Sequence, residues 1–259
     1  MIDTHAHIYL EHFSEDIDGV IDRALQNGIH KILLPNIDSS TIDQMLELES
    51  QYPDICYPMM GLHPCSVKED FEKELRLIED WMNKRSFLAV GEMGTDLYWD
   101  KTFWNQQREA FHFQCELALK HNLPVVIHCR ETIDETIEMA MKYQGKGLKG
   151  VFHCFTGTIE QGKQITDMGF HLGLGGVSTF KNGGMDQVIP HLEQTKIILE
   201  TDSPYLTPAP YRGKRNEPAY VSIIADKVAE CLNTSKEALV ELTTANANAL
   251  FFPNKIASH

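Results

Sequence analysis

The sequence lacks long apolar runs: nowhere are eighteen consecutive residues apolar. Its N-terminus has neither a basic segment followed by an apolar stretch nor a helix rich in Arg and Ser, which are the patterns of secretory and transit peptides. Because a membrane-spanning helix needs about 18 or more such residues, we expect no membrane partner and a cytoplasmic location. The six cysteines include no C-x-x-C pair, and we expect them to be reduced and structural.

Positive charge is also scarce. The chain has 23 Lys and Arg residues against 37 Asp and Glu residues, which gives a formal net charge of -14. Proteins that hold long nucleic-acid duplexes by general electrostatics are usually basic, so this class of protein is disfavoured. An anionic substrate remains compatible with the composition, because bound divalent cations concentrate positive charge at one point of an acidic molecule.

Eight short apolar runs alternate with segments of helical periodicity along the chain. The runs cover residues 1–7, 31–37, 56–63, 88–94, 123–129, 150–155, 170–177 and 196–202. A final helical pair is expected around residues 221–231 and 236–250. This alternation predicts βα units and a parallel sheet. Eight such units favour an α/β fold of the (β/α)8 TIM-barrel type, as a single domain over residues 1–259, and an open α/β sheet is the alternative.

Side chains able to bind metal stand at the ends of these runs rather than along the predicted helices. They are His5, His7, His63, Glu92, His128, His153 and Asp202. In a barrel, the C-terminal ends of all strands form one rim, where the active sites of this fold are assembled. The placement therefore predicts that these side chains meet at a common site.

His5 and His7 are separated by one residue, so the strand period of two directs both imidazoles to the same side and one metal can reach both. Glu92 lies among glycines, which allow close backbone approach and leave the carboxylate as the reaching group. A carboxylate can offer one oxygen to each of two cations held roughly 3.5 to 4 Å apart. The ordinary alternatives are two incidental histidines near a terminus and a buried glutamate paired with an arginine.

His128 and His153 each close a strongly apolar run, and Asp202 ends another run just before Pro204. Taken singly, the histidines could be hydrogen-bonded core residues and Asp202 could cap a helix. Four histidines and two carboxylates on one rim favour a shared metal centre instead. Mixed imidazole and carboxylate ligands leave the metal open, since zinc and manganese accept nitrogen ligands whereas magnesium prefers oxygen.

Six segments resemble the TatD family of metal-dependent deoxyribonucleases, a TIM-barrel branch of the amidohydrolase superfamily. They are residues 1–7, 61–64, 91–96, 128–130, 153–157 and 200–204, in family order and spacing. The resemblance implies two divalent metal ions (Mg, Mn or Zn). It places His5, His7, Glu92 and Asp202 around the first ion, and Glu92, His128 and His153 around the second.

The resemblance also points to substrate-binding residues. The loop at residues 211–218 contains Arg212 and Asn216, and loops after the last strands of a barrel often hold phosphate. Arg130 and His63 are further candidates for contacting a phosphate oxygen. A solvated turn is the plain alternative for Arg212. Thr95 stands where the family resemblance leads us to expect an aliphatic residue, which suggests a changed substrate contact.

Phosphodiester hydrolysis is the leading functional hypothesis, with Asp202 as the proton acceptor and Glu92 as the other catalytic residue. The resemblance implies an exonuclease-like activity on DNA, and the acidic charge favours single-stranded or frayed ends over a long duplex. Two alternatives remain open. One is a metal-dependent hydrolase of esters or amides, such as a D-aminoacyl-tRNA deacylase, and the other is a binding module that has lost turnover.

Overall fold

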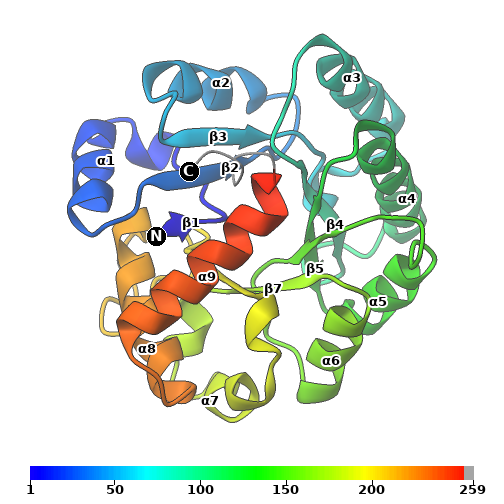
Figure 1. Ribbon diagram of the computed structural model, residues 1–259. Helices are drawn as coiled ribbons and strands as arrows, with labels where there is room; N and C mark the ends of the chain where they lie inside the picture. Colours follow the sequence, from blue (N-terminus) through cyan, green and yellow to red (C-terminus); the bar gives the residue numbers. More distant parts are fainter. Residues whose placement is uncertain (254–259) are drawn as a thin grey trace.

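The computed structural model of the chain describes residues 1–253. Strands and helices alternate in it along the sequence (Figure 1). The strands are β1 (Ile2–Asp3), β2 (Lys31–Pro35), β3 (Cys56–Met59), β4 (Val90–Asp96), β5 (Val125–Arg130), β6 (Gly150–Phe152), β7 (His171–Leu174) and β8 (Ile197–Leu199). The helices are α1 (Ile17–Gln26), α2 (Ile42–Gln51), α3 (Phe71–Lys84), α4 (Trp104–His121), α5 (Ile133–Met141), α6 (Ile159–Asp167), α7 (Met185–Val188), α8 (Val221–Cys231) and α9 (Lys236–Phe251).

All strand pairs are parallel, in the orders β1-β2-β3 and β4-β5-β6-β7-β8. Backbone hydrogen bonds join the two groups at both seams. At one seam Met60 donates to Ala89 over 3.1 Å, and at the other Thr4 donates to Leu199 over 3.1 Å. The eight strands therefore close on themselves, which confirms the predicted (β/α)8 barrel and excludes the open sheet.

The eight strands occur where the sequence predicts them, but most are shorter at their C-terminal ends. The ladder of the first strand ends at Asp3 rather than His7, and that of the third at Met59 rather than His63. Beyond those points backbone amides bond to side chains. For example, Leu62 donates to the Gln114 amide oxygen over 2.8 Å, and Thr201 donates to the Asp3 carboxylate over 2.9 Å. At the rim, buried side chains thus satisfy part of the backbone alongside isolated backbone bonds between neighbouring segments.

The barrel interior is filled by an apolar layer to which seven strands or the residues beside them contribute. Its members are Ile2, Leu33, Met59, Ala89, Val126, Val151 and Ile198. Ile32 and Leu34, the neighbours of Leu33, belong to the larger cluster formed with the outer helices, as expected because successive strand residues face opposite sides. The core thus lies both inside the barrel and between the barrel and its helices.

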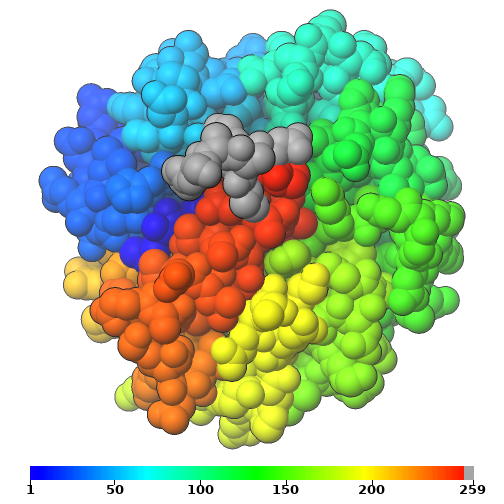
Figure 2. All heavy atoms as spheres, viewed as in Figure 1, coloured from blue at the N-terminus to red at the C-terminus, as the bar shows by residue number. Residues whose placement is uncertain are grey.

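Helix α9 closes one end of the barrel. Leu250, Phe251 and Phe252 pack on the interior layer, and the Asn246 amide donates to the carbonyl oxygen of Ile197 over 2.8 Å. Figure 1 shows α9 lying across this mouth, and its side chains occupy the centre of the same face in Figure 2. The covered end carries the N-terminal ends of the strands, so the opposite rim is the one left for a site. Within residues 1–253, none of the helices combines the length and the apolar character that a bilayer crossing requires.

We expect Leu250→Ala to lower the free energy of unfolding by about 2–5 kcal/mol, because it removes a side chain that is 3% exposed and leaves a cavity against the barrel interior. Leu242→Ala is the matched control on the same helix, since Leu242 is only partly buried and lies outside both core clusters. Urea unfolding followed by circular dichroism measures both changes. Equal losses for the two variants would contradict the assignment of α9 as the barrel's plug.

Candidate metal centre

The period of the strands places three predicted residues inside the barrel rim. His128 follows the interior residue Val126 by two positions, and His153 follows Val151 by two. Both imidazoles therefore point inward, one layer above the apolar filling. Asp202 stands four positions after Ile198 and reaches the same rim. The apolar layer below and α9 beneath it keep water from entering through the other end.

His5 and His7 lie just beyond β1 and are buried. Their backbone is bound to the continuation of β8, where Asp202 donates to the His5 carbonyl oxygen over 2.9 Å and His7 donates to the Ser203 carbonyl oxygen over 2.7 Å. The two Nε2 atoms are 3.3 Å apart. The predicted convergence of both imidazoles on one point is confirmed.

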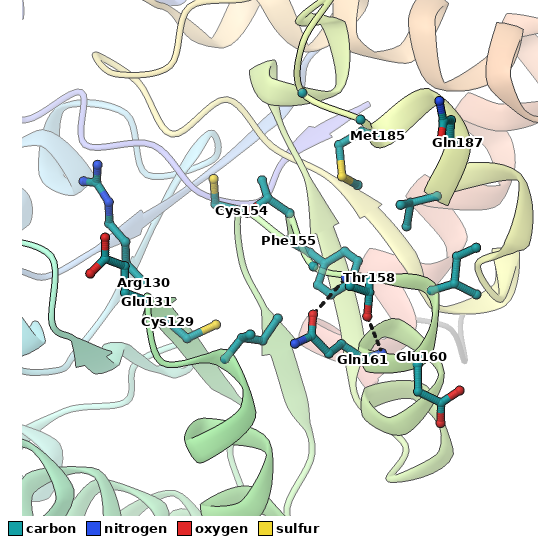
Figure 3. A pocket seen from close by; sticks show the side chains of 17 residues that line it. Cys129, Arg130, Glu131, Cys154, Phe155, Thr158, Glu160, Gln161, Met185 and Gln187 are labelled. Atoms are coloured by element: carbon teal, nitrogen blue, oxygen red, sulfur yellow. Dashed lines mark hydrogen bonds between the residues drawn. The ribbon is translucent and has the colours of Figure 1, made fainter.

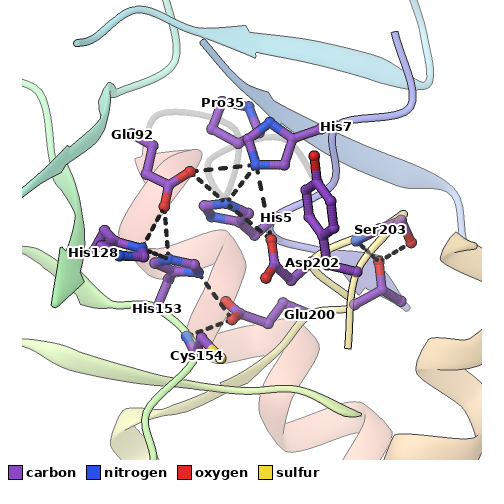
Figure 4. Close-up of polar contacts among 12 residues, drawn as sticks. His5, His7, Pro35, Glu92, His128, His153, Cys154, Glu200, Asp202 and Ser203 are labelled. Atoms are coloured by element: carbon purple, nitrogen blue, oxygen red, sulfur yellow. Dashed lines mark hydrogen bonds and ion pairs between the residues drawn. The ribbon is translucent and has the colours of Figure 1, made fainter. Parts of the chain in front are cut away.

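Glu92 is buried between two pairs of imidazoles (Figure 4). Its Oε2 lies 3.1 Å from His5 Nε2 and 3.3 Å from His7 Nε2. Its Oε1 lies 2.8 Å from His153 Nε2 and 3.0 Å from His128 Nδ1. Oε2 therefore faces one pair of imidazole nitrogen atoms, and Oε1 faces another pair with His63 Nε2 slightly farther away at 3.4 Å.

The backbone at Glu92 is positioned by close packing. The pairing of β4 with β5 shifts register between Val90 and Met93, which frees this segment from the regular ladder. The Glu92 amide instead donates to the carbonyl oxygen of Asn36 over 3.1 Å. A side chain at Gly91 would place its Cβ 2.6 Å from the Cβ of Val126, so glycine is required there for the approach that the sequence predicted.

Asp202 completes the first group of residues. Its Oδ1 is 3.8 Å from Nε2 of both His5 and His7, and its side chain is 15% exposed. The other members of the group are nearly or fully buried, so Asp202 is the carboxylate that meets solvent. It can therefore contact a substrate or water entering from the rim.

The donor set fits divalent cations. Three sets of side chains have ligand atoms within 4.8 Å of one another, namely His5, His7 and Glu92; His5, His153 and Asp202; and His63, Glu92 and His128. The Nδ1 atom of His5 is buried without a hydrogen-bond partner. Burial, with help from neighbouring imidazoles, lowers the pKa of His5 and keeps its ring neutral, as metal ligation requires. Burial opposes ionisation of Glu92, but the surrounding imidazoles hold its pKa well below the usual value.

Buried carboxylates support the site from behind. The Asp96 Oδ2 accepts from His128 Nε2 over 2.9 Å, and the Glu200 Oε1 lies 3.3 Å from His153 Nδ1. Burial raises the pKa of Asp96, but hydrogen bonds from His128 and backbone amides outweigh burial and bring it to about 2. Carboxylates behind metal-binding histidines fix the ring orientation and the tautomer.

Sequence reasoning did not assign these supporting residues. A signal was present, because Asp3, Asp96 and Glu200 each stand two or four residues from His5, Glu92 and Asp202 respectively, on strand segments with a period of two. Asn36 and Gln114 do not stand at such a spacing from a site residue, so no sequence pattern pointed to them. Their roles follow from contacts between elements that are distant in sequence.

The predicted substrate residues lie in different settings. His63 faces the centre, with Nε2 3.4 Å from Glu92 Oε1. Arg130 is exposed at the end of β5, and Arg212 is exposed with its guanidinium 3.7 Å from the ring centre of Phe180. Asn216 is fully buried, and its amide donates to the carbonyl oxygens of Thr201 and Tyr205 over 2.7 and 2.6 Å.

Thr95 corrects one expectation. Its hydroxyl is fully buried and bonds to the hydroxyls of Thr132 and Thr136 over 2.9 and 2.7 Å. Thr132 and Thr136 belong to the start of α5 on the outer side of the barrel. The prediction that Thr95 alters a substrate contact is therefore wrong, because its neighbour Asp96, rather than Thr95, faces the site.

A cavity of about 600 Å³ opens among the loops at the C-terminal ends of β5 and β6. Its wall includes Cys129 and Cys154, which directly follow His128 and His153 in sequence, together with Arg130, Thr156 and Met185 (Figure 3). The loops after β5 and β6 and the helix α7 thus enclose this space, and the residues of the candidate centre are not part of its lining. This volume is in the range of small-ligand sites.

Known proteins share this fold and sequence over nearly their whole length. A family model described as TatD related DNase matches residues 2–252. The metal-dependent hydrolase YabD of Bacillus subtilis is 36% identical, with 97% of this chain and 98% of that protein covered. The 3'-5' ssDNA/RNA exonuclease TatD of Edwardsiella piscicida is 30% identical, with coverage of 97% and 99%.

A solved structure agrees with these relatives. The crystal structure of YjjV, a TatD homologue from Escherichia coli, superimposes with a TM-score of 0.91 at 27% sequence identity and covers 97% of both chains. The matches in sequence and in structure extend across the barrel and include the rim that carries the candidate centre. The chain therefore belongs to the TatD related DNase family of metal-dependent hydrolases.

Proposed function

We propose that this protein is an exonuclease that hydrolyses phosphodiester bonds of single-stranded nucleic acid at a centre for two divalent cations. The position of Glu92 carries the proposal, because its two carboxylate oxygens face separate imidazole pairs at 2.8 to 3.3 Å. A carboxylate shared in this way suits a pair of cations. Relatives named 3'-5' ssDNA/RNA exonuclease support the substrate class.

We assign His5, His7, Glu92 and Asp202 to one cation, and Glu92, His128 and His153 to the other. His63 lies beside the second group and could ligate as well as contact substrate. Manganese and zinc accept this mixture of nitrogen and oxygen donors, whereas magnesium prefers oxygen. When bound, such cations lower the pKa of water and stabilise negative charge on the phosphate and on the leaving oxygen.

The chain's own residues would complete the reaction. Asp202 accepts the proton of the attacking water, because it is the solvent-accessible carboxylate of the first group. Arg130 and His63 orient phosphate oxygens from the rim, and Arg212 contributes charge from the loop after β8. We assign Asn216 to the support of that loop, since its amide is already bonded to two backbone oxygens there.

The alternative reaction cleaves an acyl ester. The ester group itself has no anionic oxygens that Arg130 and Arg212 could contact. We therefore expect turnover of single-stranded DNA or RNA with Mn²⁺ or Zn²⁺, and much slower turnover of blunt duplex DNA and of D-aminoacyl-tRNA. Gel analysis of end-labelled oligonucleotides and release of labelled amino acid measure the two activities. Release of the amino acid without attack on any oligonucleotide would favour the deacylase instead.

Metal binding tests the role of Glu92. We expect the wild type to bind two equivalents of Mn²⁺ and Glu92→Ala to lose at least one, because the change removes an oxygen from both groups. Glu241→Ala is the control, as Glu241 is exposed on α9 at the opposite end of the barrel. Calorimetric titration, with circular dichroism to check folding, gives the stoichiometry. Two equivalents in Glu92→Ala would refute the shared ligand.

A second variant tests the proton acceptor. We expect Asp202→Asn to lower kcat by about 10²–10⁴-fold, because the amide keeps the shape of the side chain but cannot accept the proton. The metal content of the variant is measured alongside, so that loss of a cation is separated from loss of proton transfer. Full activity in a metal-loaded Asp202→Asn enzyme would show that another group takes the proton.

A further inference from the structure

Aromatic side chains are exposed on the rim that carries the candidate centre. Within residues 1–253, the exposed aromatic residues are Tyr98, Trp99, Tyr205 and Tyr211, and Trp99 is 71% exposed. All four belong to the loops that follow β4 and β8. In the described part of the chain, exposed aromatic faces therefore gather at the C-terminal ends of the strands and not at the end that α9 covers.

Tyr98 and Trp99 are fixed to the centre through one carboxylate. Asp96 holds His128 with Oδ2 at 2.9 Å, and its Oδ1 accepts from the backbone amides of Tyr98 and Trp99 over 2.9 and 3.3 Å. Because the same side chain orients a proposed metal ligand and the aromatic pair, their relative positions are set. The two rings meet edge to face, with their centres 4.8 Å apart.

Arg130 adds positive charge to this pair. It lies opposite Asp96 in the β4–β5 register, and its guanidinium is 3.6 Å from the ring centre of Tyr98 and 5.6 Å from that of Trp99. The side chain is exposed and also borders the 600 Å³ cavity (Figure 3). We call Tyr98, Trp99 and Arg130 the aromatic rim cluster.

We propose that the aromatic rim cluster binds a nucleobase of the single-stranded substrate next to the phosphate that is cleaved. The base stacks on the indole of Trp99, and Arg130 contacts the adjoining phosphate. A flat aromatic face beside a guanidinium complements a base joined to a phosphate. Flat ligands without an anionic group would fit this cluster less well, because they leave the guanidinium without a partner. This inference rests on the proposed function and adds a substrate contact to it.

The cluster also gives a physical reason for selecting single strands. In a duplex the faces of the bases are stacked on one another, so an exposed indole has no face to pair with until a strand frays. Every base has a stacking face, so the cluster would tolerate any sequence. Selection for unpaired ends would then not depend on a broad basic surface, in a chain whose formal net charge is -14.

Kinetics on matched single-stranded substrates test the role of the aromatic rim cluster. The probes are a ten-residue oligothymidylate, the matching oligouridylate and an abasic deoxyribose-phosphate chain of the same length, each end-labelled, with Mn²⁺-loaded protein. We expect the wild type to favour oligothymidylate over the abasic chain by at least about fivefold in kcat/KM. We expect Trp99→Ala to lose this preference through a higher KM, with its rate on the abasic chain unchanged.

Two further variants separate stacking from folding. Trp99→Phe should restore most of the preference, because it returns an aromatic face. Met141→Ala removes an exposed apolar side chain at the far end of α5 and should behave as wild type. If Trp99→Ala loses the preference over the abasic chain with oligouridylate as well as with oligothymidylate, the proposal is supported for both polymers, since both present a base. A loss of preference with one polymer alone supports the proposal for that polymer.

The contrary results are distinct. Equal wild-type rates on oligothymidylate and on the abasic chain, or unchanged kinetics in Trp99→Ala, overturn the cluster's role and leave the proposed function intact. Unchanged kinetics with an altered sedimentation coefficient in Trp99→Ala would assign the cluster to contact between copies of the chain. A wild type inert on every phosphodiester probe contradicts the proposed function, and the inference falls with it.

Discussion

The buried carboxylate of Glu92, with four imidazole nitrogen atoms within 3.3 Å of it, is the constraint around which the rim is organised. An ionised carboxylate at this depth is costly unless positive charge or hydrogen-bond donors surround it. The four rings come from β1, β5 and β6, or from the residues just beyond them, and so the carboxylate is satisfied only when the barrel has closed. Folding and assembly of the centre are therefore coupled, and bound cations would stabilise the closed barrel by mass action.

The two ends of the barrel have different roles: one stabilises the fold, and the other carries the candidate centre. At one end α9 packs on the interior layer and seals it with Leu250 and Phe251. At the other end the strand ladders stop early, and buried polar side chains such as Asn36 and Gln114 satisfy the backbone. Regular strand pairing stops where the polar side chains converge. The apolar layer between the two ends supports these polar side chains from below.

Sequence patterns predicted most of the fold because the periodicities are local. All eight strands and the final helices occur where the apolar runs and helical segments predict them. Most strands, though not β4 and β5, were predicted too long at their C-terminal ends, since the bonds that end the ladders come from residues such as Asp3 and Gln114 that are distant in the chain. Thr95 lies outside the site for a similar reason, because the hydroxyl groups that bond to its side chain come from the start of α5, which lies elsewhere in the sequence.

By itself, the sequence determined the residue types of the centre, their order and their common rim. These follow from strand periodicity and from the rule that parallel strands end at one edge. Only the tertiary structure decided which oxygen of Glu92 faces which imidazole pair, and which carboxylates stand behind His128 and His153. It also decided that Trp99 is exposed beside Arg130 while Asn216 is buried. Those outcomes depend on distances between separate strands, which no local pattern of residues encodes.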